Sequence, residues 1–432
     1  MSYFNNLERE MRRLIEWLDL AKERGADTSA LESEILGFIA KAKDEAKKLQ
    51  PKPDFGYIEP DELEEIKALR RESPRVMPLN LTDDELYDRI LGAWLGRCAG
   101  CVLGVPVEGR DRDFIKAWAD KLGQSYPLSD YWADYPGISR IHYSEPVDCF
   151  VKRGIDHVGP DDDLVYTVLG LLILEEYGVD FTTEDVGSAW IKRLPMACTA
   201  EEAALENLKK GVSPKNAAEI DNPFIEWIGA DIRSDTWGYA APGLPEIAAE
   251  MAYKDAYLSH RRNGIYGEMF FSAVIAAAFA VKNLRDAIEM GAAEIPSTSR
   301  LYESIVETIE WVDKDKDWER TCGRIYEKYR GMSICHVFNN TALTISALLY
   351  SDGDFERAIA LAVMGGIDTD CNGATAGSIV GAAIGAKNIP NKWVEPFNDR
   401  LTTYLIDSKE HRITDLARRT WEIAKRCRAR FD

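Results

Sequence analysis

The chain has 432 residues, 46% of them hydrophobic, and a formal net charge of −20 at pH 7. This length allows two to three average domains or one large one, and the apolar content excludes an intrinsically disordered chain. The acidic balance argues against a general nucleic-acid surface, which would be basic, so we expect no nucleic-acid partner.

The sequence also predicts no membrane span. Its longest strongly apolar stretch, residues 272–281, is about half of what a bilayer requires. The N-terminus carries acidic residues and lacks the basic start and apolar core of a secretion signal, so we expect a cytoplasmic protein. Of the eight cysteines, only Cys98 and Cys101 lie close together, which predicts neither a disulfide framework nor a zinc tetrad.

In chain order, the first predicted element is a helical hairpin over residues 1–50. Two runs of apolar residues at helical spacing flank a break at Gly25. Pro51 and Pro53 end this unit, because proline cannot continue a helix, and a polar connecting stretch follows over residues 51–81. We interpret the hairpin as a packing or dimerisation appendage, since it carries no residue placed for catalysis.

Residues 82–432 predict one large, compact all-α domain. Thr82 and Glu85 form a capping box that opens its first helix, which continues through Trp94. Period-2 runs and alternating strand and helix units are missing from the sequence, which argues against a doubly wound sheet. Further apolar helices are predicted over residues 164–176, 184–192, 245–257, 267–281, 299–312, 341–350, 355–364, 374–386 and 414–428.

Glycine recurs at every fourth position of the first long helix, at Gly92, Gly96, Gly100 and Gly104. These positions lie nearly on one helix face, so another backbone or a ligand can approach closely there. Each interior glycine costs about 0.5–1 kcal/mol relative to alanine. Tight helix packing is one explanation, and a substrate that approaches Gly100 is the other. A helix-breaking proline follows and leaves the carboxylate of Glu108 at the exit.

Two acidic clusters stand at helix starts far apart in the sequence. Asp161, Asp162 and Asp163 follow a Gly-Pro pair and precede an apolar helix. Asp368 and Asp370 follow a glycine pair and precede a Gly/Ala-rich helix. One or two acids satisfy helix capping, at roughly 0.3–1 kcal/mol each, and a further carboxylate that faces inward is costly without a cation. Together the clusters predict one divalent-metal site with oxygen ligands, which suits Mg²⁺, Mn²⁺ or Ca²⁺.

On these motifs the sequence resembles the ADP-ribosylglycohydrolase family, over roughly residues 88–428. The family has a glycine-spaced helix running into a Gly-x-Pro-x-Glu turn, a Thr-Asp-Asp-Thr helix start, and Gly-Gly-Asp-Thr-Asp-Thr before a small-residue helix. The matching segments are Gly104-Val105-Pro106-Val107-Glu108, Pro160-Asp161-Asp162-Asp163 and Gly366-Ile367-Asp368-Thr369-Asp370-Cys371. The resemblance implies an all-α fold that holds two Mg²⁺ ions between the latter two motifs.

The resemblance also implies roles for single residues. The implied metal ligands are Asp161, Asp162, Asp368 and Asp370, joined by Asp163 in place of a motif threonine. Among the site residues, we expect Glu108, Asp162 and Asp370 to act in catalysis. Two departures from the family weaken the ligand set: Pro160 has no side-chain donor, and the sulfur of Cys371 suits Mg²⁺ poorly.

Outside the motifs, three polar or aromatic residues are candidates to line a substrate pocket with Gly100. They are Trp237, His260 and Glu268. An indole can stack on an adenine or another ring, and a buried imidazole or carboxylate can bind polar groups of a substrate. The alternative for each is a place in the core with its polar atoms satisfied.

The sequence therefore predicts a metal-dependent hydrolase that cleaves a glycosidic bond to ribose, in an ADP-ribose conjugate or a related nucleoside or sugar compound. In this hypothesis carboxylates stabilise the cationic sugar-like transition state. The loss of both threonines motivates an alternative, a non-catalytic or retasked member of the fold that binds a nucleotide or sugar. Hydrolysis of a pyrophosphate with the same cations is a third possibility. The expected partner is a small-molecule or ADP-ribosylated substrate, and the leaving group and the oligomeric state stay open.

Overall fold

The computed structural model describes residues 6–50, 52, 54–135, 137 and 140–431. The chain divides into two compact units, Met1–Gly56 and Tyr57–Asp432. In the smaller unit, α1 (Asn6–Glu23) and α2 (Ser29–Lys47) flank Gly25, as the sequence predicts. Gly25 has a φ of 81°, a left-handed conformation that glycine adopts at little cost. Residues 1–5, Pro51 and Pro53 of the predicted hairpin and its end lie outside the described residues.

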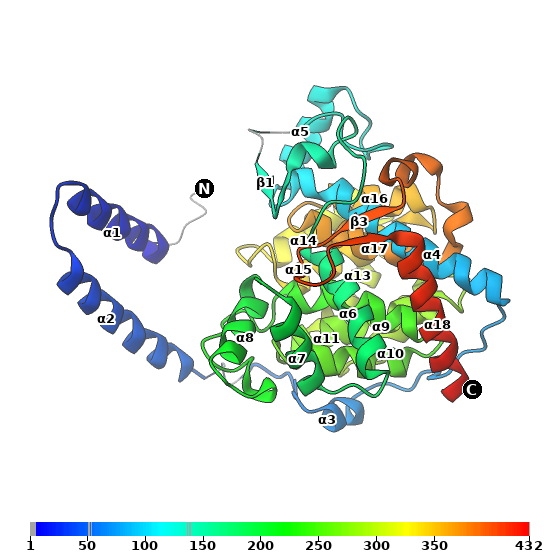
Figure 1. The fold of residues 1–432 in the computed structure, drawn as a ribbon, viewed down its shortest axis with the longest axis horizontal. Helices are drawn as coiled ribbons and strands as arrows, with labels where there is room; N and C mark the ends of the chain where they lie inside the picture. Colours follow the sequence, from blue (N-terminus) through cyan, green and yellow to red (C-terminus); the bar gives the residue numbers. More distant parts are fainter. Residues whose placement is uncertain (1–5, 51, 53, 136, 138–139, 432) are drawn as a thin grey trace. The chain divides into compact units, whose positions relative to one another are not determined.

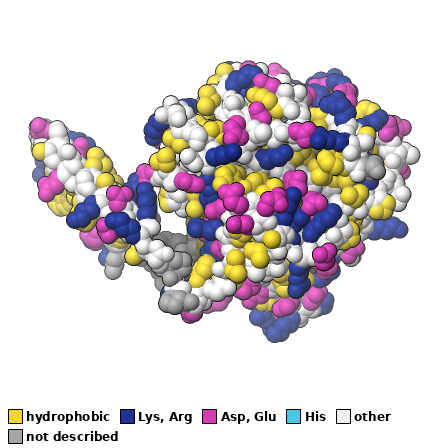
Figure 2. Space-filling model, turned by 90° about the horizontal axis from the view of Figure 1, so that it is seen from below, with side chains coloured by type: hydrophobic (Ala, Val, Ile, Leu, Met, Phe, Trp, Pro, Cys, Tyr) yellow, Lys and Arg dark blue, Asp and Glu magenta, His cyan; other side chains and the backbone are white. Residues whose placement is uncertain are grey.

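The apolar side chains of this smaller unit are largely exposed. Leu7, Trp17 and Phe38 are 70%, 68% and 73% exposed, and Figure 2 shows hydrophobic side chains at the surface of the two helices. Most helices in proteins are stabilised by burying one apolar face. The smaller unit buries little apolar surface of its own.

The larger unit begins with an irregular stretch, residues 57–82, that packs on the helical domain. It contains α3 (Leu63–Ala68), and both Ile66 and Met77 are buried. Arg70 extends the contact, because its Nη2 donates to Glu246 Oε1 at 2.7 Å. These contacts correct the predicted connecting stretch: from Tyr57 onward the chain belongs to the domain, although its polar composition resembles that of a linker.

The rest of the larger unit confirms the predicted all-α fold. Its first helix opens with the predicted capping box, in which the Thr82 amide donates to Glu85 Oε2 at 2.8 Å. The helices of this part, shown in Figure 1, are α4 (Asp83–Gly104), α5 (Arg112–Leu122), α6 (Asp162–Tyr177), α7 (Thr183–Arg193), α8 (Thr199–Lys209), α9 (Asp235–Ala240), α10 (Pro245–Ala256), α11 (Asn263–Ala278), α12 (Leu284–Ala292), α13 (Arg300–Asp315), α14 (Trp318–Lys328), α15 (Val337–Ser351), α16 (Phe355–Met364), α17 (Thr369–Ile384) and α18 (Ile413–Phe431).

The strands of the described residues form two small antiparallel pairs. β1 (Ile141–His142) pairs with β2 (Glu145–Pro146), and β3 (Arg400–Thr402) pairs with β4 (Glu410–Arg412). The first pair is closed by a tight turn in which Tyr143 has a φ of 50°. Such short strands do not form a layer of the fold, but the first pair fixes the position of one side chain, that of His142.

Helices α4 and α17 lie side by side within the larger unit (Figure 1). Their glycines face one another, since a Cβ on Gly96 would lie 2.1 Å from Gly377 O, and a Cβ on Gly100 would lie 1.8 Å from Gly373 O. Any side chain larger than hydrogen would clash there, so helix packing explains the glycine spacing. Gly100 therefore has a packing role, and its contact with substrate stays a prediction.

Helix α4 is also long and apolar enough to cross a membrane. The stretch Asp83–Val107 passes that test of length and composition, but 89% of its most apolar window is buried inside the structure. Trp94, for example, is fully buried and donates from Nε1 to Thr420 Oγ1 at 3.1 Å. The helix is a central core element, and its apolarity follows from this burial.

Candidate metal centre

The two acidic clusters meet where α6 and α17 begin. Asp161 is the N-cap of α6, and its Oδ1 accepts a hydrogen bond from Asp163 N at 2.9 Å. Asp368 is the N-cap residue of α17, and Asp370 lies in the first turn of that helix. A carboxylate oxygen of Asp161 and one of Asp370 lie within 4.8 Å of each other. Helix capping and helix packing together therefore bring carboxylates of both clusters to one place.

Asp370 reaches this place because α4 and α17 touch backbone to backbone. A Cβ on Gly104 would lie 2.3 Å from both Asp370 N and Thr369 O, and Thr369 Oγ1 donates to Gly104 O at 2.8 Å. Ile367, just before the cluster, has a φ of 62°, which strains a β-branched residue. The backbone bonds that hold it include Ile367 N to Arg110 O at 2.8 Å.

His142 lies against Asp161 and comes from outside both clusters. The imidazole is largely buried, and its Nε2 is 2.8 Å from Asp161 Oδ2. Burial acts to raise the pKa of Asp161, but the contact with His142 outweighs it and lowers that pKa below the ordinary value. On its other side, His142 Nδ1 is 3.9 Å from Glu108 Oε2. The imidazole therefore lies between a buried carboxylate and a partly exposed one.

Asp163 is paired with a buried arginine. Arg97 Nη2 donates to Asp163 Oδ1 at 2.9 Å, and Arg97 Nη1 lies 2.6 Å from Asp235 Oδ2. Burial acts to lower the pKa of Arg97, but the two carboxylates outweigh it and raise that pKa, so the guanidinium stays charged. Asp163 Oδ2 has no hydrogen-bond partner among the described residues. Asp163 thus keeps one oxygen that is free to bind a cation.

Burial makes the charged forms of the other carboxylates costly. It raises the pKa of Asp368 to about 6 and that of Asp370 well above its ordinary value, and the charge of Glu108 acts in the same direction. The pKa of Asp162 is also raised well above its usual value, by burial and by the charge of Asp161. Asp370 Oδ1 has no hydrogen-bond partner in the described part of the chain. A bound divalent cation would satisfy this oxygen and favour the ionised carboxylates.

The donor atoms of the centre fall into overlapping sets. Within each set the ligand atoms lie within 4.8 Å of one another; the sets are His142, Asp161 and Asp370; Asp163, Asp370 and Cys371; and Asp161, Asp162 and Asp163. Asp370 belongs to two sets, so it can lie between two cations. Predicted ligand Asp368 is in none of these sets. The carboxylates fit a divalent cation, whereas His142 and Cys371 depart from the all-oxygen set that Mg²⁺ prefers.

The predicted substrate residues Trp237, His260 and Glu268 lie together in another buried network, around Arg233. Trp237 Nε1 donates to Glu268 Oε1 at 2.8 Å, and Arg233 Nη2 donates to Glu268 Oε2 at 3.4 Å. His260 Nδ1 is 2.8 Å from Ser259 Oγ, and burial together with the charge of Arg233 lowers the pKa of His260 well below its usual value. These contacts place the three residues in the core, although His260 Nε2 has no hydrogen-bond partner among the described residues, and their contact with a substrate stays a prediction.

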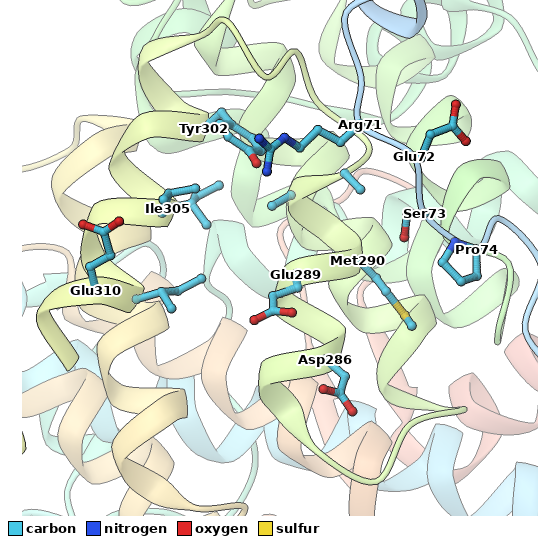
Figure 3. Close-up of a pocket in the computed structure, with 14 residues that line it drawn as sticks. Arg71, Glu72, Ser73, Pro74, Asp286, Glu289, Met290, Tyr302, Ile305 and Glu310 are labelled. Atoms are coloured by element: carbon cyan, nitrogen blue, oxygen red, sulfur yellow. The ribbon is translucent and has the colours of Figure 1, made fainter. Parts of the chain in front are cut away.

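A cavity of about 520 Å³ lies elsewhere in the larger unit, between α12, α13 and the stretch 71–74 (Figure 3). Its lining includes Arg71, Glu289 and Glu310. It shares no residue with the donor sets of the metal centre, so the two are separate features.

The sequence analysis did not predict a role at the site for three buried residues near the centre: Arg97, His142 and Asp231. Arg97 had a visible signal, because a charged residue inside an otherwise apolar helix is rarely buried without a partner. Asp231, in the short helix Ile228–Arg233 (η4), is buried, and neither of its oxygens has a hydrogen-bond partner among the described residues. The missing side chain of Gly267 makes room for it, since a Cβ there would lie 1.9 Å from Asp231 Oδ1.

Fold and site together define an all-helical protein with a buried carboxylate centre suited to divalent cations. The chain belongs to the ADP-ribosylglycohydrolase family, whose model matches residues 82–430. It is also similar to a solved chain described as "ADP-ribosylglycohydrolase-related protein complex", with a TM-score of 0.53 and 20% sequence identity over 80% of this chain and 99% of that one. At this identity the similarity shows the fold. No curated protein matches the chain.

Proposed function

We propose that this chain is a metal-dependent glycohydrolase that cleaves a glycosidic bond to ribose, in an ADP-ribose conjugate or a related nucleoside or sugar compound. The observation that carries the proposal is the convergence of Asp161 and Asp370, from two helix starts, with Asp370 Oδ1 left without a partner among the described residues. Such a buried oxygen is costly unless a cation meets it. Membership of the family supports the reaction class.

We assign different roles to the residues of the centre according to how exposed they are. Asp161, Asp163 and Asp370 are buried and would hold the cation, which when bound would polarise the attacking water and orient the ribose hydroxyls. Asp162 is partly exposed and lies beside the other ligands, so it would take a proton from the attacking water. Glu108 is also partly exposed and would stabilise the positive charge that develops on the sugar.

Arg140 supports this role of Glu108. Its Nη2 donates to Glu108 Oε2 at 3.1 Å, which fixes the direction of the carboxylate. Trp132 supports the end of α4, which comes shortly before Glu108, because its Nε1 donates to Leu103 O at 3.1 Å. The carboxylate therefore stands on a supported backbone at the edge of the centre.

A second candidate function is a retasked member of the fold that binds a nucleotide or sugar without cleaving it. The ion pair between Arg97 and Asp163 favours this alternative, because it occupies one carboxylate oxygen of the centre. Pro160 and Cys371, in place of the family's threonines, also favour it. Under either function we propose a cytoplasmic protein with a small-molecule or ADP-ribosylated partner and without a nucleic-acid or membrane partner.

A substrate panel tests the proposal. ADP-ribosylated arginine, ADP-ribosylated serine and nucleosides are incubated with the protein, a divalent cation or EDTA, and the released ribose compound is measured. We expect release that EDTA stops, and a loss of about 10²-fold or more in Asp370→Asn. Asp120→Asn, on an exposed face of α5, is the matched control and should keep full activity. Binding of ADP-ribose without product supports the alternative, and product in EDTA contradicts the metal-dependent reaction.

A further inference from the structure

The donor atoms of the metal centre are not all oxygen. In one set His142 offers a ring nitrogen, and in another Cys371 offers a sulfur. Mg²⁺ and Ca²⁺ take oxygen ligands, whereas imidazole and thiolate select transition metals such as Fe²⁺, Co²⁺ and Zn²⁺. We infer that the centre binds divalent transition metals in preference to Mg²⁺, one through His142 Nε2 and one through Cys371 Sγ. This inference deepens the proposed function and rests on the same cation site.

The position of His142 fits a ligand. Two ligand atoms that are each about 2.1 Å from a metal and at right angles to each other lie about 3 Å apart. His142 Nε2 and Asp161 Oδ2 are already 2.8 Å apart, so both can reach one cation with little movement. A metal that binds Nε2 leaves Nδ1 to a nearby carboxylate, as ligating histidines usually do, and Glu108 Oε2 lies 3.9 Å from it.

The ring of His142 is also held in place. It packs edge-on against Phe150, with ring centroids 5.4 Å apart, and against Tyr143, with centroids 4.8 Å apart. Its backbone is fixed in β1, where it stands opposite Glu145. A ring fixed on both sides loses little freedom when it binds a metal, which favours binding.

Cys371 belongs to the donor set that also contains Asp163 and Asp370. It is buried in the first turn of α17, and its thiol lies close enough to Asp163 and Asp368 to influence the pKa of each carboxyl. The resemblance expects a threonine at this position, so a hard hydroxyl oxygen is replaced by a soft sulfur. Each of the two carboxylates in its donor set, Asp163 and Asp370, has one oxygen without a hydrogen-bond partner among the described residues.

An ordinary core cysteine is the alternative role for Cys371. Cys427 in α18 is such a residue: it is buried, and among the described residues it belongs to no donor set. Cys371 differs from it because a carboxylate oxygen of Asp163 and one of Asp370 lie within 4.8 Å of its sulfur. Cys427 therefore supplies a matched control in the same protein.

Cobalt provides a readout that requires no substrate. The full-length protein is stripped with a chelator and titrated with Co²⁺ while the near-ultraviolet absorption is recorded, because a thiolate bound to Co²⁺ gives a charge-transfer band. The affinities for Co²⁺ and Mg²⁺ are measured by calorimetry. Most nitrogen and oxygen sites also favour later metals, so the deciding quantity is the change in the Co²⁺ to Mg²⁺ affinity ratio between variants.

We expect the charge-transfer band in the unmodified protein and in Cys427→Ser, and its loss in Cys371→Thr. The affinity ratio should fall about 10-fold or more in both Cys371→Thr and His142→Gln. Circular dichroism checks that each variant is folded, and if Cys371→Thr is not, His142→Gln decides. Absence of the band in the unmodified protein overturns the inference, as does a ratio that neither variant changes.

The same readouts separate this inference from the proposed function. A charge-transfer band with no cleavage of any substrate supports the metal assignment and contradicts only the proposed reaction. Cleavage with Mg²⁺ by a protein that shows no band, with a ratio that neither variant changes, overturns the metal assignment and leaves the proposed reaction standing.

Discussion

Replacing Gly104 with alanine tests whether the contact of α4 with α17 positions the metal centre. Gly104 has helical backbone angles, φ −79° and ψ −41°, so alanine meets no conformational obstacle. The new Cβ would lie 2.3 Å from Asp370 N and from Thr369 O. Nonbonded carbon atoms need about 3.5–4.0 Å, so the first turn of α17 must move by roughly 1.2–1.7 Å.

The expected cost follows from two opposing effects. Forcing one methyl group into a packed interior costs about 1–3 kcal/mol. Removing a glycine from a helix returns about 0.5–1 kcal/mol, so Gly104→Ala should lower the free energy of unfolding by up to about 2.5 kcal/mol. The same displacement moves Asp370, and binding sites tolerate errors of only about 0.5 Å. The affinity for a divalent cation should therefore fall about 10-fold or more.

Denaturant unfolding followed by tryptophan fluorescence measures the first quantity, because every tryptophan except Trp17 lies in the larger unit. Calorimetry with a divalent cation measures the second. Gly323→Ala is the matched control: Gly323 lies in the exposed part of α14, and a Cβ there meets nothing within 4 Å. This control should gain about 0.5–1 kcal/mol. A Gly104→Ala protein as stable as Gly323→Ala, with unchanged affinity, would refute the reasoning.

Three further predictions concern charge at the centre. Arg97→Met should lower the free energy of unfolding by about 3–5 kcal/mol, because it leaves Asp163 and Asp235 buried without their cation; a loss under about 1 kcal/mol in denaturant unfolding contradicts this. In EDTA, Asp368→Asn should match the unmodified protein at pH 4 and exceed its stability by about 2–3 kcal/mol at pH 7. The reason is that burial raises the pKa of Asp368 from 3.8 to about 6, so the folded protein binds the extra proton and loses stability as the pH rises through that interval. An equal difference at both pH values contradicts the assignment. Adding a divalent cation at 100 times its Kd should raise the free energy of unfolding by about 2.7 kcal/mol, and Asp370→Ala should show no such gain.

The sequence predicts the all-α fold and the acidic helix starts because both depend on local chemistry. The capping box at Thr82 is recognisable within four residues, and the structure contains it. Asp161 accepts from the amide of Asp163, two residues along the chain, so its position follows from the helix start. The glycines of α4 predict close packing, but which helix approaches them depends on matching glycines in α17. Such long-range matches have no signal in a local pattern.

The rest of the centre depends on tertiary contacts. His142 reaches Asp161 from a two-residue strand, and nothing in its neighbourhood in the sequence distinguishes it from the other histidines. Trp237, His260 and Glu268 have the right residue types for a substrate pocket, yet they are buried in the core, where Glu268 bonds to Trp237 and Arg233 and His260 Nδ1 bonds to Ser259. A residue type predicts what a side chain can do, and only its partners decide whether it is free to do it.

A comparison of the metal centre with the carboxylates around Arg233 shows why hydrogen-bond partners matter. The carboxylates bonded to Arg233 include Glu201, Asp255 and Glu268, an excess of acid over base similar to that of the metal centre. Excess acid alone therefore does not indicate a metal, because burial can raise a pKa and leave the carboxyl neutral. At the metal centre Asp370 Oδ1 has no hydrogen-bond partner among the described residues, while both oxygens of Glu268 are bonded. Free, converging donor atoms distinguish a candidate metal centre from an ion network that is complete without one.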